Sequence, residues 1–390
     1  MTIFLYFTYK ILSKYFSLKT TLFSIVLVCF LTCTSIFFVV GGGAVEEYCL
    51  PIFAYMLYTF LEYLDGQYFR VGRAIIWGIC IGALILIKFT MIVLPGIILI
   101  LLLIKCIKEK RWKFFIEMLW VALGMVVSIV PFVIYFAKCN ALKDFLMVYF
   151  YDNIFLYGPK GHFLLPYFYV FVGGIACAFF MIWGVVAARH NKWYMSLFLS
   201  HLVVMLFTGN FSYYFLPLTM YCIVGCGYFI EWILTKWPVL AKKAVLISAT
   251  VILLALTLFV GNPTIEMFNK KEDYMQFAIA KDIQQLDYED PSMFCYKLWD
   301  FGFYNVAGIV PDVKHFAQNV YNEEDFPAMY EAFRSYITEQ QVDILIVDKE
   351  AYDEESWIGE YYTYYKTYSY RYYKDNTKSY TLSVVMMLKK

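Results

Sequence analysis

The sequence is short of charge. Only 16% of its 390 residues are Asp, Glu, Lys or Arg, whereas 62% are hydrophobic. Soluble domains average about 25% charged and about 45–50% apolar residues. This difference excludes an ordinary cytosolic enzyme, a disordered chain and a secreted disulfide scaffold. The net charge of +1 lacks the clustered basic surplus of a nucleic-acid binder, so we expect no nucleic acid among its partners.

Metal-ligand patterns and arginine are also scarce. The four histidines are scattered, and the chain contains neither H-E-x-x-H nor C-x-x-C, so a histidine-based or zinc-finger-like site is not expected. Most of the ten cysteines are expected to be small buried hydrophobic residues. Only six of the 32 cations are arginine, which leaves phosphate recognition mainly to lysine.

What the chain has in abundance is apolar segments close to the length of about 20 residues that crosses a bilayer. The segment 74–104 is too long for one span and is expected to form two helices that turn near Lys88–Thr90. We therefore expect a polytopic α-helical membrane protein with about nine spans. The apolar segments are 20–40, 50–64, 74–104, 115–136, 163–187, 194–207, 215–234 and 244–260.

The distribution of cations predicts the orientation of these spans. With the N-terminus in the cytoplasm, the inner loops collect fifteen Lys and Arg residues and the outer loops before the last span collect four. Positive charge is enriched in cytoplasmic loops. We therefore expect a multi-pass protein of the cell membrane whose C-terminal part lies outside the cytoplasm.

The composition changes at Gly261, where charged residues become frequent and apolar runs shrink to strand length. Residues 292–299 and 342–347 are typical of buried strands, and 328–341 has helical spacing. Alternating tyrosines at 368–372 and the run 380–388 indicate a hairpin. We expect a transmembrane domain over 1–261 and a small extracytoplasmic α/β domain over 262–390.

An acidic pair, Glu46 and Glu47, follows three glycines between the first two spans. Carboxylates at the end of an apolar helix are costly unless they are solvated or bound to something. They are candidates for a general base or for a ligand of a metal–phosphate group. A solvated loop behind a glycine helix stop is the alternative.

Further candidates lie in the other outer turns. Lys88 could neutralise a lipid phosphate, or its amine could reach the interface. Tyr213 and Tyr214 could stack on a sugar, or anchor the chain at the interface. Asn153 is a candidate substrate contact in a loop, 140–162, that otherwise suits a segment lying on the bilayer. The aromatic stretch 299–304 could bind glycan or end a strand.

These outer-turn features resemble bacterial membrane glycosyltransferases related to glycosyltransferase family 39, the protein O-mannosyltransferase-like branch of the GT-C fold. The matching residues are the Gly-Gly-x-x-Glu46-Glu47-Tyr48-x-Leu50-Pro51 segment, Gly82-x5-Lys88-Phe89-Thr90, Gly209…Tyr213-Tyr214-x-x-Pro217 and Trp299-Asp300-Phe301-Gly302-x-Tyr304…Pro311. They extend from about residue 20 to the end of the chain.

The resemblance implies that a sugar is transferred from a polyprenyl-phosphate carrier to a glycan or protein acceptor on the outer face of the membrane. Glu46 or Glu47 would be the base or a metal ligand, Lys88 the phosphate partner, and Tyr213 and Tyr214 sugar contacts. A divalent metal is an option, and no other cofactor is expected. Membrane lipid is the remaining partner.

One departure from the family concerns its first outer loop, which usually carries an acidic motif. Glu46-Glu47 corresponds to the family's second acidic position, so the chain is expected to be N-terminally truncated, with residues 1–9 as the end of a longer helix. There are two rival functions. One is a transporter or flippase of lipid-linked saccharide, and the other is a non-catalytic membrane scaffold. A transporter would more often show inverted repeats and charged midplane helices.

Overall fold

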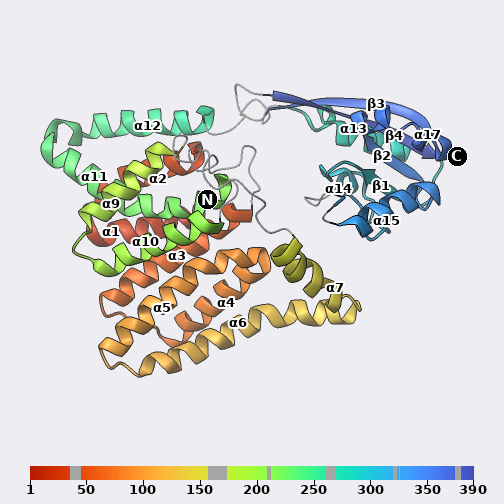
Figure 1. Cartoon of the computed structure of the whole chain (residues 1–390). Coiled ribbons are helices and arrows are strands. Elements are labelled where there is room, and N and C mark those ends of the chain that lie inside the picture. The colour runs from red at the N-terminus through yellow and green to blue at the C-terminus, as the bar shows by residue number, and fades with distance from the viewer. Residues whose placement is uncertain are drawn as a thin grey trace. The chain divides into compact units, whose positions relative to one another are not determined.

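A computed structural model describes residues 1–35, 45–156, 174–208, 212–260, 269–318, 323–324, 326–373 and 379–390 (Figure 1). Contacts divide the chain into two compact units. The first consists of Met1–Phe145 with Pro159–Asn262, and the second of Leu146–Gly158 with Pro263–Lys390. Each is described by itself.

The first unit is helical. Among the described residues, Val71–Lys108, Lys113–Lys138 and Tyr213–Lys236 are long and apolar enough to cross a membrane, and four shorter apolar helices accompany them. The count of nine spans stays a prediction. The helices are α1 (Thr2–Tyr15), α2 (Leu18–Thr34), α3 (Val45–Leu64), α4 (Val71–Lys88), η1 (Phe89–Ile92), α5 (Val93–Lys108), α6 (Lys113–Lys138), α7 (Leu142–Leu146), α9 (Ile175–Ala187), α10 (Lys192–Thr208), η3 (Ser212–Tyr221), α11 (Cys222–Lys236), η4 (Pro238–Ala241) and α12 (Lys243–Val260).

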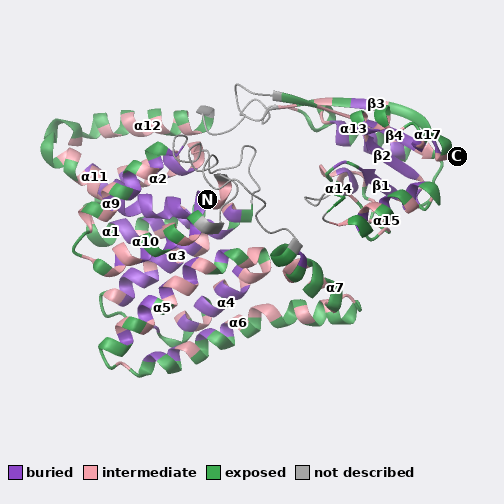
Figure 2. Ribbon diagram, viewed as in Figure 1, coloured by how far each residue is buried: buried purple, intermediate pink, exposed green. Residues whose placement is uncertain are grey.

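The N-terminal helix α1 is longer than the nine-residue segment that the sequence indicates. It runs for 14 residues to Tyr15, and Phe4, Ile11 and Leu12 on it are buried. It packs against α2, α3 and α11. Figure 2 shows the buried residues concentrated where these helices meet. The segment is therefore part of the core of the first unit.

Glycines set the closest helix contacts in this unit. A Cβ on Gly78 of α4 would lie 1.9 Å from the carbonyl oxygen of Val121 on α6, and one on Gly124 would lie 2.1 Å from that of Ile75. Helices α9 and α11 meet in the same way through Gly184 and Gly225. Small residues that let backbones approach are typical of helix packing in membranes.

The long apolar stretch Val71–Lys108 is interrupted where the sequence predicts a turn. Helix α4 ends at Lys88, whose backbone is extended (φ −161°, ψ 105°), and the 3₁₀ turn η1 leads into α5. An unbroken helix of these 38 residues would be about 57 Å long, almost twice the thickness of a bilayer's hydrocarbon core. The break places Lys88 at a helix end.

The second unit contains a four-stranded sheet in the order β1-β2-β4-β3. Strand β1 (Met293–Tyr296) is parallel to β2 (Ile344–Asp348), and the hairpin strands β3 (Tyr362–Tyr373) and β4 (Ser379–Lys389) are antiparallel to their neighbours. All four lie where the sequence predicts strands. The hairpin turn at 374–378 lies outside the described residues.

Period-two alternation in β1 and β2 divides the core of this unit into two layers. Phe294, Leu345 and Val347 join one cluster with α15 (Pro327–Thr338), whereas Cys295 and Ile346 join another with α13 (Met275–Gln284). Successive side chains of a strand point to opposite faces, so one helix covers each face. The remaining helices are η2 (Met147–Leu156), η6 (Lys271–Asp273), α14 (Phe303–Ala307), α16 (Lys349–Glu354) and α17 (Ile358–Tyr361).

Candidate functional site

Glu46 lies in the first turn of α3 and is only 1% exposed. Its carboxylate forms an ion pair with Lys88 Nζ. Removing two charges from water is costly unless they are paired and hydrogen-bonded. The positive end of the α3 dipole adds a favourable contribution to the carboxylate. The alternative of a solvated loop residue does not hold for Glu46.

Lys88 is held on two sides. Its Nζ lies 3.6 Å from the ring centroid of Tyr214 and 5.6 Å from that of Tyr213, while the same amine pairs with Glu46. The two tyrosine rings meet edge to face at 5.0 Å. A cation over an aromatic face is attracted by the ring quadrupole. The Lys88 amine is thus bound inside the protein rather than extended to the interface.

Three segments far apart in the sequence build this cluster. Helix α3 contributes Glu46, the break after α4 contributes Lys88, and the turn η3 contributes the tyrosines. Helices α3 and η3 pack against each other, and Leu216, Leu218 and Met220 of η3 are buried. The apolar side of η3 therefore fixes its tyrosines beside the start of α3. We call Glu46, Lys88, Tyr213 and Tyr214 the Lys88 cluster.

Glu47 has different surroundings from Glu46. It is half-buried and lines a small cavity of about 160 Å³ together with Met1, Phe4, Tyr48 and Leu50. Successive residues of a helix point about 100° apart, so adjacent carboxylates diverge. The acidic pair of the sequence is divided between two places, and only Glu46 belongs to the Lys88 cluster.

Asn153 lies in the second unit, on η2. Its side-chain amide donates hydrogen bonds to the carbonyl oxygens of Val148 and Tyr149, at 3.0 and 3.1 Å. The neighbouring Asp152 is buried, and this burial raises the pKa of its carboxyl, opposed by the positive charges of His315 and Lys314. The donors of the Asn153 side chain are used within its own helix.

The aromatic stretch 299–304 forms a turn. The Asp300 carboxylate accepts the backbone N–H groups of Gly302 and Phe303, both at 2.9 Å, and Gly302 adopts φ +88°. Tyr304 is buried, with its hydroxyl 2.7 Å from the carbonyl oxygen of Met293. These contacts favour the structural alternative for this stretch over glycan binding.

Sequence reasoning missed one buried polar cluster. Arg111 forms an ion pair with Glu117, and the hydroxyl of Tyr63 donates to Glu117 Oε2 at 3.2 Å. Arg111 Cζ also lies 3.4 Å from the ring centroid of Tyr68. The sequence signal that could have found this cluster was Glu117, a carboxylate near the start of the apolar segment 115–136. These contacts join α3 to the loop between α5 and α6, and we assign them a structural role.

No group of three or more His, Cys, Asp or Glu side chains suited to a metal ion occurs among the described residues. Asp, Glu and water oxygens are the usual ligands of a divalent ion such as Mg²⁺. In the described part of the chain, the carboxylate of Glu46 pairs with the Lys88 amine. A divalent metal stays a prediction from the family resemblance.

The chain is similar in structure to a solved protein, ArnT from Cupriavidus metallidurans in the apo state. The TM-score is 0.59 at 13% sequence identity, over 98% of this chain and 81% of that one. No family model matches the sequence. No curated protein matches it either.

The likeness covers both units of the chain and confirms the GT-C fold that the sequence resemblance implies. Together with the apolar helices it identifies a membrane protein. The narrower relation to family 39 stays an expectation, because at 13% identity the likeness is one of fold.

Proposed function

We propose that this chain is a glycosyltransferase that moves a sugar from a polyprenyl-phosphate-linked donor to a glycan or protein acceptor at the outer face of the membrane. The observation that carries the proposal is the Lys88 cluster, in which a buried acid, a cation and two aromatic rings converge. The GT-C fold of the structural neighbour supports the same class of reaction.

Each member of the cluster has a role in the proposed reaction. Glu46 takes the proton from the hydroxyl group of the acceptor while the oxygen of that hydroxyl bonds to the anomeric carbon of the sugar. The bond from that carbon to the phosphate oxygen breaks, and the polyprenyl phosphate leaves with the electron pair. Lys88 stabilises the added negative charge. Tyr213 and Tyr214 provide ring faces and hydroxyls for the sugar.

The ion pair between Glu46 and Lys88 must open for this chemistry. A donor phosphate can take the place of the carboxylate on the Lys88 amine, which frees Glu46 to act as the base. Glu47, beside the small cavity, keeps the metal-ligand role expected for one of the two acids. Asn153, in the second unit, stays a candidate substrate contact.

The test is transfer of label from a radiolabelled polyprenyl-phosphate sugar in membranes containing the full chain. Removing a general base costs about 10²–10⁴ in rate, so Glu46→Gln should lose at least about a hundredfold in activity. Glu109→Gln is the matched control, because Glu109 is an exposed carboxylate at the end of α5 that pairs with Lys105, outside the Lys88 cluster. Full activity in the Glu46→Gln/Glu47→Gln double variant would falsify the assignment.

The same assay separates the rival functions. A flippase moves the intact lipid-linked saccharide between leaflets, so label stays on the lipid and becomes accessible from the other side. A scaffold neither transfers the sugar nor moves the lipid-linked saccharide between leaflets. The truncation expected from the family resemblance is tested by adding any in-frame sequence that lies upstream in the gene and measuring whether transfer increases.

A further inference from the structure

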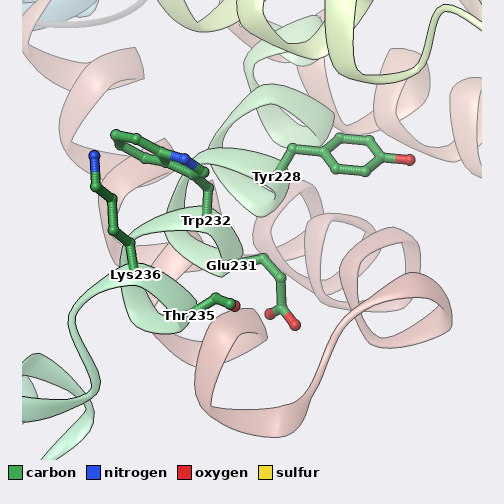
Figure 3. Close-up of a pocket in the computed structure, with 5 residues that line it drawn as sticks. All are labelled: Tyr228, Glu231, Trp232, Thr235 and Lys236. Carbon is green, nitrogen blue, oxygen red and sulfur yellow. The ribbon is translucent and has the colours of Figure 1, made fainter.

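A hollow of about 430 Å³ lies on α11, outside the Lys88 cluster (Figure 3). Figure 3 shows the Glu231 carboxylate and the Lys236 amine pointing to different sides of the helix, and the amine lies 5.1 Å from the centroid of the Trp232 ring. Tryptophan and lysine at the end of a span are usual anchors at the level of the lipid headgroups. The hollow is therefore a feature of a span end and gathers no groups around one polar ligand. Its lining residues are Tyr228, Glu231, Trp232, Thr235 and Lys236.

The end of α6 differs from that of α11, because an apolar helix follows it at once. Asn140 adopts φ +54°, a left-handed conformation that commonly ends a helix, and α7 begins at Leu142. The rings of Phe136 on α6 and Phe145 on α7 stack, with 4.5 Å between their centroids and 10° between their planes. Helix α6 is long and apolar enough to cross a membrane. Phe145 is therefore held at the end of a candidate span.

The next helix, η2 in the second unit, has its polarity reversed relative to a helix that faces water. Among residues 147–155, Asp152 is the one buried side chain, and the charges of His315 and Lys314 in the same unit act on its carboxylate. The large apolar side chains are instead 42% to 68% exposed. They are Met147, Val148, Tyr151, Ile154 and Phe155.

A group of exposed apolar side chains marks contact with a membrane or with another protein. The connection to α6 favours the membrane. Since η2 begins directly after α7, Phe155 follows Phe145 by only ten helical residues. These correspond to at most about 15 Å, about half the thickness of a bilayer's hydrocarbon core. The aromatic rings of η2 are also of the kind that enters the boundary between headgroups and acyl chains.

We propose that η2 lies on the surface of the bilayer, at the end of α6 that carries Phe136, with its exposed apolar side chains inserted among the lipids. Asp152 stays turned toward the protein, so no charge of η2 enters the lipid. The partner is the lipid surface itself, and no particular headgroup is required. Helices bound in this way insert their apolar side chains about 5–10 Å into the boundary between headgroups and acyl chains.

The experiment attaches a nitroxide to single cysteines in a full-length variant without native cysteines, in nanodiscs of phosphatidylcholine and phosphatidylglycerol. Collision with oxygen reports contact with lipid, and collision with a nickel chelate reports contact with water. Labels at positions 151 and 155 should favour oxygen, at a depth of about 5–10 Å. A label at Phe132, exposed on α6, is the lipid reference. A label at Asp353, an exposed position of the second unit, is the water reference.

A charge introduced on η2 tests whether the lipid contact depends on its apolar side chains. Phe155→Asp should shift the label at position 151 toward the nickel chelate, because a charge among lipids is costly. Phe155→Leu is the matched control and should leave the depth unchanged. Labels that collide with the chelate as often as the one at Asp353, labels shielded from both reagents by protein, or no shift in Phe155→Asp would each overturn the proposal. None of these readouts depends on sugar transfer, so the proposal is independent of the proposed function.

Discussion

At the scale of single residues, the ion pair between Glu46 and Lys88 is the main finding. Sequence spacing marked both residues as candidates but could not pair them, because 42 positions separate them and the contact depends on tertiary packing. It also could not choose between Glu46 and Glu47. That choice follows from the rotation of α3, which turns Glu46 toward Lys88 and Glu47 toward the small cavity lined by Met1 and Phe4.

A double-mutant cycle measures this pair. Lys88→Met removes the cation and leaves a buried carboxylate, which should lower the stability of the protein by about 3–5 kcal/mol. Adding Glu46→Gln should recover most of that loss, because a neutral amide needs no counter-charge. The measurement is thermal unfolding of the single and double variants in detergent. Additive losses in the double variant would mean that the two side chains are not energetically coupled.

Binding of the donor separates a phosphate ligand from a purely structural lysine. Lys88→Gln should weaken binding of the polyprenyl-phosphate sugar, whereas Glu46→Gln should strengthen it, because the carboxylate no longer competes for the amine. Equilibrium binding of radiolabelled donor to the purified variants gives both values. Unchanged affinity in Lys88→Gln would remove the phosphate role from Lys88.

At the scale of elements, the sequence predicted most helices and strands because apolar periodicity is a local property. It placed the break in Val71–Lys108 near Lys88 and located all four strands of the second unit. It underestimated α1, because Lys10 and Lys14 interrupt an apolar run without ending a helix. Close contacts such as that of Gly78 with α6 could not be predicted, since they depend on which helices become neighbours.

The packing of α4 against α6 is tested by adding a single methyl group. In Gly78→Ala the new Cβ meets the backbone of α6 at 1.9 Å, and overpacking of this kind costs about 1–3 kcal/mol. Gly96→Ala on α5 is the matched control, because no atom lies within 4 Å of its Cβ and alanine favours a helix. Thermal unfolding should therefore shift downward only for the Gly78 variant.

Helix α13 is tied to β3 by a titratable contact. Burial raises the pKa of Asp282, but hydrogen bonds from Lys366 Nζ (2.7 Å) and the Tyr368 hydroxyl (2.5 Å) outweigh it, and the net pKa is lowered. A lowered pKa stabilises the folded state above the ordinary aspartate value of about 3.9, and this stabilisation is lost as the pH falls through the folded-state pKa.

The corresponding prediction compares Asp282→Asn with the parent protein across pH. The variant should be less stable than the parent at about pH 7, and the difference should shrink as the pH falls through the folded-state pKa of Asp282. Thermal unfolding of the full chain gives the comparison. Asp353→Asn, at an exposed carboxylate paired with Lys349, is the control and should differ little from the parent across the same range. A constant difference across the range would exclude a charge-dependent contact.

At the scale of the whole molecule, orientation in the membrane rests on the distribution of lysines and arginines. In a variant without native cysteines, a cysteine at the exposed position Asp353 should react with an impermeant maleimide in intact cells. A cysteine at Lys110, in the loop between α5 and α6, should react only after lysis. The reverse pattern would invert the proposed topology.

Independent folding of the C-terminal region is a second prediction at this scale. Residues 265–390 contain all four strands and both core layers, so they should unfold cooperatively when expressed alone. This fragment omits 146–158, which belong to the same compact unit. If η2 binds this unit, adding residues 146–158 as a peptide should raise the midpoint of unfolding of the fragment. Circular dichroism measures the unfolding of the fragment with and without the peptide.

The Lys88 cluster has a consequence for charge balance. Empty, the pair of Glu46 and Lys88 is neutral as a whole. A donor phosphate that replaces Glu46 on the amine brings negative charge into surroundings that are largely apolar, and such charge is costly without compensation. Glu46 has to stay ionised to act as the base, and a phosphodiester takes up no proton near neutral pH, so the compensation has to be a cation that enters with the donor. Donor binding should therefore tighten when Mg²⁺ is supplied and weaken when a chelator removes it, and equilibrium binding of radiolabelled donor measures this before any sugar is transferred.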